Sequence, residues 1–316
     1  MSMLSSVAER LYWMARYLER AEDTARLTNA YSQFILDVPV GSAPGWESLV
    51  NVVDGQSTFE SRYKNYNERN VMKFMTADLD NLSSIRYSIK SARECVRTTR
   101  DALPDRCWEM VNELYIFANE YAESSISRKA RFEFLEQVIA RVEQTTGLMV
   151  SSLSRDHAYR FIRMGRLLER SDMTTRVIDV IANSVHRHSN DNTDVSWLLG
   201  YLLKSLSAVT AYRREAGPLV DADEVVNFLF KQPEFPRSLY FCLSGIRADA
   251  KGLKNREELD KVSSAVLRRL SRFDAAKFDF ATLHHYIDGL QEQLIDLDSI
   301  VFATWFSRES AFCRGR

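Results

Sequence analysis

The sequence AERLYWMARYLERAEDTARL at residues 8–27 returns as AYRFIRMGRLLERSDMTTRV at residues 158–177, an offset of 150 positions. In both copies apolar residues recur at the three- and four-residue spacing of an amphipathic helix. Nine of the twenty aligned positions are identical. They are Ala8/Ala158, Arg10/Arg160, Met14/Met164, Arg16/Arg166, Leu18/Leu168, Glu19/Glu169, Arg20/Arg170, Thr24/Thr174 and Arg26/Arg176. The repeat predicts two related helices, and with them a duplicated helical fold.

Charge accounts for most of what the two copies share. Four arginines, one glutamate and one threonine are identical, whereas a duplicated helix would ordinarily keep its apolar stripe first. Arginine stands at all four basic positions, which favours planar, bidentate pairing, because an exposed face would accept lysine equally well. Three interpretations follow: a buried structural ion network, an anion or substrate site, or solvated intrahelical pairs. The intrahelical pairs would be Arg16 with Glu19, Glu22 with Arg26, Arg166 with Glu169, and Asp172 with Arg176.

If the two copies form a shared site, the helices at 6–33 and 155–185 should pack together about an approximate two-fold axis. Glu19 and Glu169 should then be buried and bonded to arginines of other helices. The candidate residues in this repeat are Arg16, Glu19, Arg20, Arg26, Arg166, Glu169, Arg170 and Arg176.

The rest of the chain is also predicted to be helical. Only six prolines and eleven glycines occur, and between them no alternating strand pattern persists. Ser6 and Ser154 are expected to cap the two repeat helices, and Pro104 suits the first turn of another helix. Further helices are expected near 126–152, 194–213, 221–231, 236–252, 257–270 and 277–308. Because no linker rich in Pro, Ser or Gly divides the chain, we expect one compact all-α bundle over residues 1–316, with about ten helices and pseudo-duplicated halves.

Composition excludes several classes of protein. A formal net charge of -1, from 42 basic and 43 acidic residues, gives no basis for binding nucleic acid or anionic lipid. There is no run of 18 apolar residues and no uncharged apolar segment at the start, and the four cysteines lack CxxC spacing. We therefore expect a reduced, cytoplasmic protein outside the membrane. The sequence is compatible with a homo-oligomer.

Motifs for metals and cofactors are missing from the sequence. The five histidines never follow the Glu-x-x-His spacing of di-iron bundles, so no metal site is expected. Neither GxGxxG nor GxxxxGK[ST] occurs, and no cofactor is expected. Cys95 is interpreted as a small buried hydrophobic residue rather than an activated thiolate.

The segments LSSVAERLYWMARYLERAEDTARL (4–27) and SRDHAYRFIRMGRLLERSDMTTRVID (154–179) resemble the two signature helices of the bacterial Alpha-E family. The resemblance continues through 83–115 and 233–243. It implies that the Glu-Arg motif of the family falls on Glu19-Arg20 and Glu169-Arg170, and that a basic middle helix carries Arg93, Glu94, Arg97 and Arg100. It also implies partners, because family members are typically encoded beside, or fused to, a circularly permuted ATP-grasp ligase and a transglutaminase-like protease.

These partners imply a role in making or processing amide-linked peptides. The expected role is a non-catalytic partner or substrate-presenting module of that system. One alternative is an enzyme of the same pathway, with glutamate as general base and arginine as carboxylate clamp. The other is a purely structural helical subunit.

Two surfaces are candidates for contact with such partners. The segment 217–241 is rich in apolar residues and broken by Pro233 and Pro236. Much of it is expected to be core, and the alternative is a docking surface anchored by Phe235 and Arg237. The middle helix carries a basic stripe at three- and four-residue spacing, from Arg86 to Arg100. This stripe could bind an anionic polymer, remain solvated, or pair with the acids of the repeat.

Overall fold

The computed structural model describes residues 4–38, 44–187 and 192–306. Over these ranges the chain forms fourteen α-helices and three short 3-10 helices, and no strand. The α-helices are α1 (Ser5–Asp37), α2 (Glu47–Val52), α3 (Gln56–Glu60), α4 (Glu68–Thr76), α5 (Ile85–Arg97), α6 (Asp105–Tyr121), α7 (Arg128–Ser152), α8 (His157–Arg187), α9 (Asn192–Ser205), α10 (Val209–Ala216), α11 (Ala222–Lys231), α12 (Leu239–Ala250), α13 (Glu257–Ser271) and α14 (Phe280–Trp305). The all-α class is confirmed.

The helix count exceeds the expected ten for two reasons. The sequence pattern did not reveal α2, α3 and α4, which are only 6, 5 and 9 residues long. The segment expected as one helix near 194–213 is two, because Ser207 adopts a left-handed conformation with φ of 51° and ends the first.

The pseudo-duplication extends to every helix, so that α1–α7 match α8–α14 in order. At the α2–α3 turn the Gly55 N–H donates to the Val50 carbonyl, and at the α9–α10 turn the Ala208 N–H donates to the Leu203 carbonyl. In each turn the residue before the donor has a positive φ, 52° and 51°. Both turns are Schellman-type helix ends, and they stand at equivalent places in the two halves.

The loops that lead into α5 and α12 repeat one another as well. Ser84 and Ser238 are the N-caps, and their hydroxyls accept from the backbone N–H three residues later. Each hydroxyl also donates to the carbonyl six residues earlier, that of Asp78 or of Gln232. Conserved caps at equivalent places explain how the two halves keep one architecture with little sequence identity.

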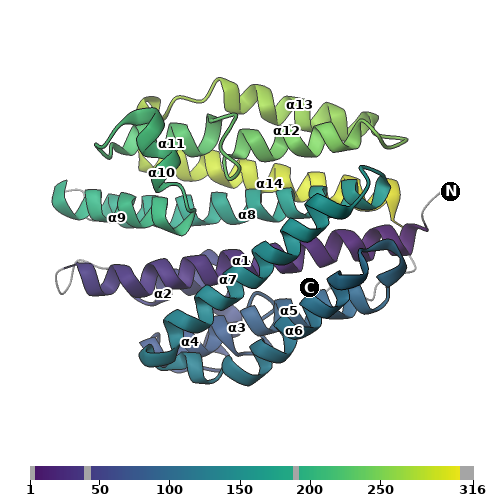
Figure 1. Ribbon diagram of the computed structural model, residues 1–316. Coiled ribbons are helices and arrows are strands. Elements are labelled where there is room, and N and C mark those ends of the chain that lie inside the picture. Colours follow the sequence, from purple (N-terminus) through teal and green to yellow (C-terminus); the bar gives the residue numbers. More distant parts are fainter. Residues whose placement is uncertain (1–3, 39–43, 188–191, 307–316) are drawn as a thin grey trace.

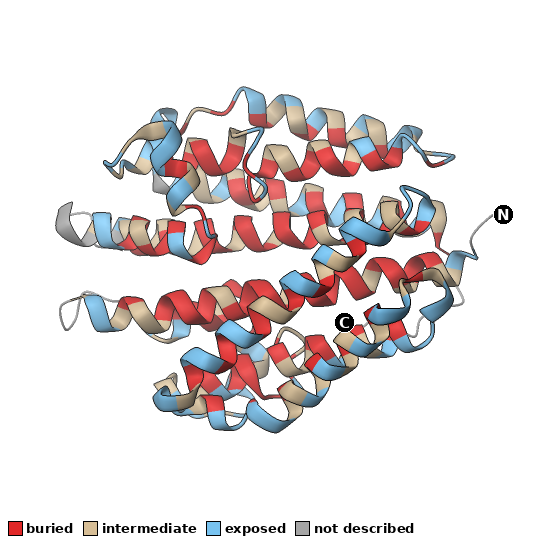
Figure 2. Ribbon diagram, viewed as in Figure 1, coloured by how far each residue is buried: buried red, intermediate tan, exposed pale blue. Residues whose placement is uncertain are grey.

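Helices α1 and α8 are the centre of the molecule. They lie side by side and both run from right to left in Figure 1, with α5 and α6 beyond α1 and α12 and α13 beyond α8. The two backbones come very close at Gly165, where a Cβ would lie 2.4 Å from the Tyr12 carbonyl oxygen. Figure 2 shows buried residues along most of both helices, including the many polar ones of the repeat. The predicted packing of 6–33 against 155–185 is therefore confirmed.

The helix starts differ from the predicted caps by a few residues. Helix α1 begins at Ser5 after Leu4, with no side-chain cap, so the expected capping box at Ser6 is wrong. Helix α8 begins at His157, beyond Ser154, and the Asp156 carboxylate accepts from the Tyr159 N–H at 3.3 Å. Pro104 stands immediately before α6 rather than inside its first turn. No helix in the described ranges is both long and apolar enough to cross a membrane.

Candidate functional site

The candidate site is an ion network in the interface between α1 and α8. On one side the Glu169 carboxylate accepts from Arg16 Nε at 2.7 Å, and from Arg20 Nε and Nη2 at 2.5 and 3.1 Å. The Glu169 side chain is 3% exposed. Burial opposes its ionisation, but the charges of Arg20 and Arg16 lower the pKa of Glu169 to about 2.

Arg16 binds a second carboxylate. Its Nη1 donates to Asp298 Oδ1 of α14 at 2.7 Å, and the Tyr12 hydroxyl donates to the same oxygen at 2.6 Å. Its guanidinium also lies over the Trp13 ring, 4.8 Å from the centroid. This arginine is thus fully engaged by groups from three helices.

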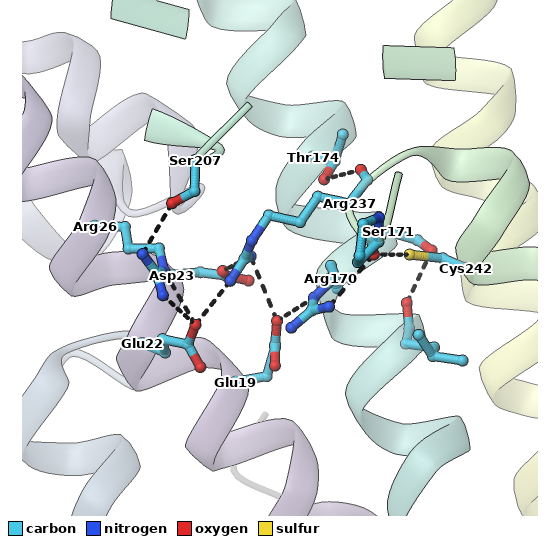
Figure 3. Close-up of polar contacts among 12 residues, drawn as sticks. Glu19, Glu22, Asp23, Arg26, Arg170, Ser171, Thr174, Ser207, Arg237 and Cys242 are labelled. Atoms are coloured by element: carbon cyan, nitrogen blue, oxygen red, sulfur yellow. Dashed lines mark hydrogen bonds and ion pairs between the residues drawn. The ribbon is translucent and has the colours of Figure 1, made fainter. Parts of the chain in front are cut away.

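The other side of the interface is centred on Glu19, whose side chain is 1% exposed. Glu19 Oε1 accepts from Arg170 Nε at 2.5 Å and from Arg237 Nη1 at 3.4 Å. Arg237 comes from the loop before α12 and extends between α1 and α8 (Figure 3). Both signature glutamates are therefore buried and bonded to arginines of other elements, as expected.

Arg237 holds three acids of α1 at once. Besides Glu19 it donates to Glu22 Oε1 at 2.8 Å and, through Nη1, to Asp23 Oδ1 (Figure 3). Asp23 Oδ2 has no hydrogen-bond partner. Burial raises the pKa of Asp23 to about 7, opposed by Arg237 and reinforced by the neighbouring carboxylates of Glu19 and Glu22.

The contacts obey an approximate two-fold axis along the two helices. Arg20 of α1 binds Glu169 of α8, and Arg170 of α8 binds Glu19 of α1. The same two repeat positions therefore pair twice, once in each direction across the interface. The threonines follow the same rule, because Thr24 donates to the Ser83 carbonyl and Thr174 donates to the Arg237 carbonyl. The repeat therefore preserves its charges where the two halves meet.

Only two of the four predicted intrahelical pairs form. Arg26 binds Glu22 and Arg176 binds Asp172, both one turn apart. The predicted pairs Arg16–Glu19 and Arg166–Glu169 are wrong, because each glutamate faces the opposite helix and meets an arginine there.

Arg166 departs from the symmetry. Arg16, its equivalent, holds two carboxylates, but Arg166 makes no ion pair within the described residues and its Nε has no hydrogen-bond partner. Glu19 Oε2 is also without a partner. Both residues line a cavity of about 20 Å³ between α1, α7 and α8.

Arg93, Glu94 and Arg97 lie outside this network. They are on the side of α5 that faces α6 and solvent, with side chains 24%, 46% and 51% exposed. Arg93 donates to Asn112 of α6 and packs on the Tyr115 ring. Both arginines pair with Glu94, so the basic stripe does not reach the acids of the repeat.

The segment 217–241 is not the predicted docking surface. Phe235 and Arg237, its proposed anchors, are 7% and 6% exposed. Phe235 packs on Phe228, and Arg237 belongs to the ion network. The prolines shape a loop that enters the core, whereas the sequence pattern alone could not show which way its side chains point.

Sequence reasoning missed the acids and bases that complete the network. Asp23 aligns with Met173 in the other copy, and Asp298 and Arg237 belong to neither copy, so no local signal linked these residues to the repeat. The described part of the chain holds no group of three His, Cys, Asp or Glu side chains placed to bind a metal ion. Cys95, Cys107 and Cys242 are buried, and burial raises the pKa of Cys242 to about 11.

Comparison with known proteins agrees with the all-α architecture and with the Glu-Arg motif. A family model described as a predicted alpha-helical domain with a conserved ER motif matches residues 3–306. Uncharacterized proteins of Mycobacterium bovis and Mycobacterium tuberculosis are 20% identical over 312 residues, which cover 92% of this chain and 34% of theirs. The chain thus spans about a third of the length of these curated relatives. No solved structure matches it.

Proposed function

Because the chain belongs to the Alpha-E family, we propose that it is a non-catalytic partner or substrate-presenting module of an amide-forming peptide system. Its partners would be a circularly permuted ATP-grasp ligase and a transglutaminase-like protease. The observation that carries this proposal is the burial of the Glu-Arg motif, with Glu19 and Glu169 only 1% and 3% exposed at the side chain.

Burial argues against the enzymatic alternative. A general base must come within hydrogen-bond distance of the proton that it takes. Glu169 already accepts three hydrogen bonds from Arg16 and Arg20, and its pKa of about 2 makes it a poor base. The motif is better suited to fixing the relation between the two halves than to chemistry on a substrate.

The length of the relatives supports a module that works beside other domains. About two thirds of each mycobacterial relative lies outside the matched region. A fused Alpha-E module would leave that much room for a ligase. A separate chain would need a docking surface for the same partner.

We propose that this surface is the groove between α6 and α7. It has a volume of about 540 Å³ and is lined by apolar side chains such as Phe117 and Phe134. Its charged lining residues are three glutamates and one arginine, namely Glu113, Glu120, Glu133 and Arg141. Ile116 and Tyr121, also in its lining, are 54% and 43% exposed. These apolar side chains and the excess of glutamates fit a basic amphipathic segment of the ligase. Its apolar face would pack in the groove, and its basic side chains would meet the glutamates.

The test is binding of a circularly permuted ATP-grasp ligase from the same genome. Purified chain and ligase should form a complex by calorimetry that weakens with added salt, and the complex should raise the rate of ATP-dependent amide formation. Ile116→Glu should weaken binding at least about tenfold, as expected for loss of one apolar anchor. Ile295→Glu, at a site 62% exposed on α14, is the matched control and should bind normally.

Two results would refute the proposal. One is a ligase that neither binds nor responds to the folded chain. The other is amide formation or hydrolysis by the chain alone that is lost in Glu169→Gln with folding retained, because it would make the motif catalytic.

A further inference from the structure

The cavity beside Arg166 has an occupied counterpart in the same molecule. Helices α7 and α14 correspond with an offset of 152, which aligns their N-caps Ser127 and Asp279. The same offset aligns buried residues of both helices, namely Leu135/Ile287, Val138/Leu290, Val142/Leu294 and Met149/Val301. Thr146 of α7 is therefore the equivalent of Asp298 of α14. In the central pair, Ile162 is the equivalent of Tyr12.

Beside Arg16 the counterpart space is filled by the protein itself. Asp298 supplies a carboxylate to the guanidinium and Tyr12 donates to that carboxylate. Beside Arg166, Thr146 and Ile162 supply neither group, and both line the cavity of about 20 Å³. The space that the Asp298 carboxylate fills beside Arg16 is thus a cavity beside Arg166 in the other half.

The polar atoms around the cavity lack partners. Arg166 has no ion pair in the described ranges, and its pKa is lowered because burial outweighs the attraction of Glu19. Arg163, also in the lining, pairs with Asp249 and keeps its side chain 28% exposed. The buried Nε of Arg166 has no hydrogen-bond acceptor, which is costly, and an incoming anion would remove that cost.

We infer that the cavity between α1, α7 and α8 is a binding site for a carboxylate group, held by Arg166 in the way that Arg16 holds Asp298. About 20 Å³ is room for one or two water-sized atoms, which suits carboxylate oxygens but not a whole ligand. The rest of the ligand would leave past Val150, which is 39% exposed on the rim. Arg16 already holds Glu169 and Asp298 together, so Glu19 is no obstacle to a second carboxylate on Arg166.

The carboxylate can come from a small acid or from an acidic side chain or C-terminus of a peptide. The site rests on its geometry alone and does not require the proposed ligase. If the ligase fails to bind, only the proposed function is refuted, since the carboxylate site is measured on the isolated chain.

The test uses calorimetric and NMR titration of the full chain with sodium acetate against sodium chloride at equal ionic strength. Saturable binding of acetate should shift the Arg166 Nε resonance. Arg166→Gln should weaken it about tenfold or more, because a hydrogen bond to a charged group contributes about 1.5–3 kcal/mol. A short peptide with a free C-terminal carboxylate and its amide-capped form are the second arm: tighter binding of the free peptide than of acetate identifies a peptide as the source, and equal binding identifies a small acid.

Thr146→Asp is the decisive variant, because it would place an internal carboxylate where Asp298 stands in the other half. It should raise the melting temperature and abolish acetate binding, whereas Thr146→Ser, which adds no atoms to the cavity, should keep binding. The inference is overturned if neither acetate nor the free peptide binds saturably, if Arg166→Gln binds as well as the wild type, or if Thr146→Asp still binds acetate.

Discussion

Arginine geometry explains why the repeat has no lysine at its basic positions. Arg20 uses Nε and Nη2 on the two oxygens of Glu169, and Arg237 reaches three carboxylates with two nitrogens. A lysine ammonium is a single point charge and could not span these acceptors. The arginines that are identical in the two copies are therefore explained by the geometry of the contacts between the two halves.

Asp23 predicts a pH dependence of stability. Its folded-state pKa of about 7 lies above the ordinary aspartate value of 3.8, so the folded state binds the proton more tightly than the unfolded state. The stabilisation is complete below about pH 4 and is lost as the pH rises through about 7. Asp23→Asn should therefore flatten the fall in unfolding free energy between pH 5 and pH 7.5, measured by urea denaturation. An unchanged slope would show that Asp23 is ionised throughout.

At the scale of single elements, the close contact of α1 and α8 depends on glycine at one position. A Cβ at Gly165 would clash with the Tyr12 carbonyl, which belongs to backbone and cannot rotate away. The equivalent position in α1 is Ala15. The two copies differ here because only Gly165 faces the backbone carbonyl of Tyr12 at this short distance. The ion pairs need this short distance between the two helix axes.

Gly165→Ala should therefore destabilise the protein by about 1–3 kcal/mol, the cost of overpacking. Gly147→Ala in α7 is the matched control, because nothing lies within 4 Å of its Cβ position. That change should stabilise by about 0.5–1 kcal/mol, since glycine is a poor helix former. Thermal unfolding of the two variants checks both signs, and equal effects would contradict the close approach.

Periodicity predicted the long helices well, because their buried stripes are set by local spacing. It failed for α2–α4, which are too short to show a period. It also failed for the helix caps, because several neighbouring residues could each serve as the N-cap. Arg237 was predicted on a surface because a loop has no period that marks its buried side. Its partners Glu22 and Asp23 are more than 200 positions away in the sequence.

At the scale of the whole molecule, the sequence revealed the duplication only where α1 meets α8. Elsewhere the halves share buried positions, turns and caps. Many different side chains can fill such positions, so the sequences of the two halves differ there. At the interface Arg16 and Arg20 meet Glu169, and Arg170 meets Glu19, so a change to one of these residues must be matched in the other half. The Glu-Arg motif of this Alpha-E chain therefore acts as a clamp, that is, a set of ion pairs that holds its two halves together.

A double-mutant cycle on Arg20 and Glu169 tests that claim most directly. Glu169→Gln leaves Arg16 and Arg20 buried without their carboxylate and should cost about 3–5 kcal/mol in urea unfolding. Arg20→Gln should add much less in the Glu169→Gln background than alone, with a coupling energy of about 1.5–3 kcal/mol. The intrahelical pair Arg176–Asp172, with side chains 28% and 23% exposed, is the control and should couple by about 0.3–0.5 kcal/mol. A coupling across the halves no larger than this control, with Glu169→Gln as stable as the wild type, would contradict the clamp.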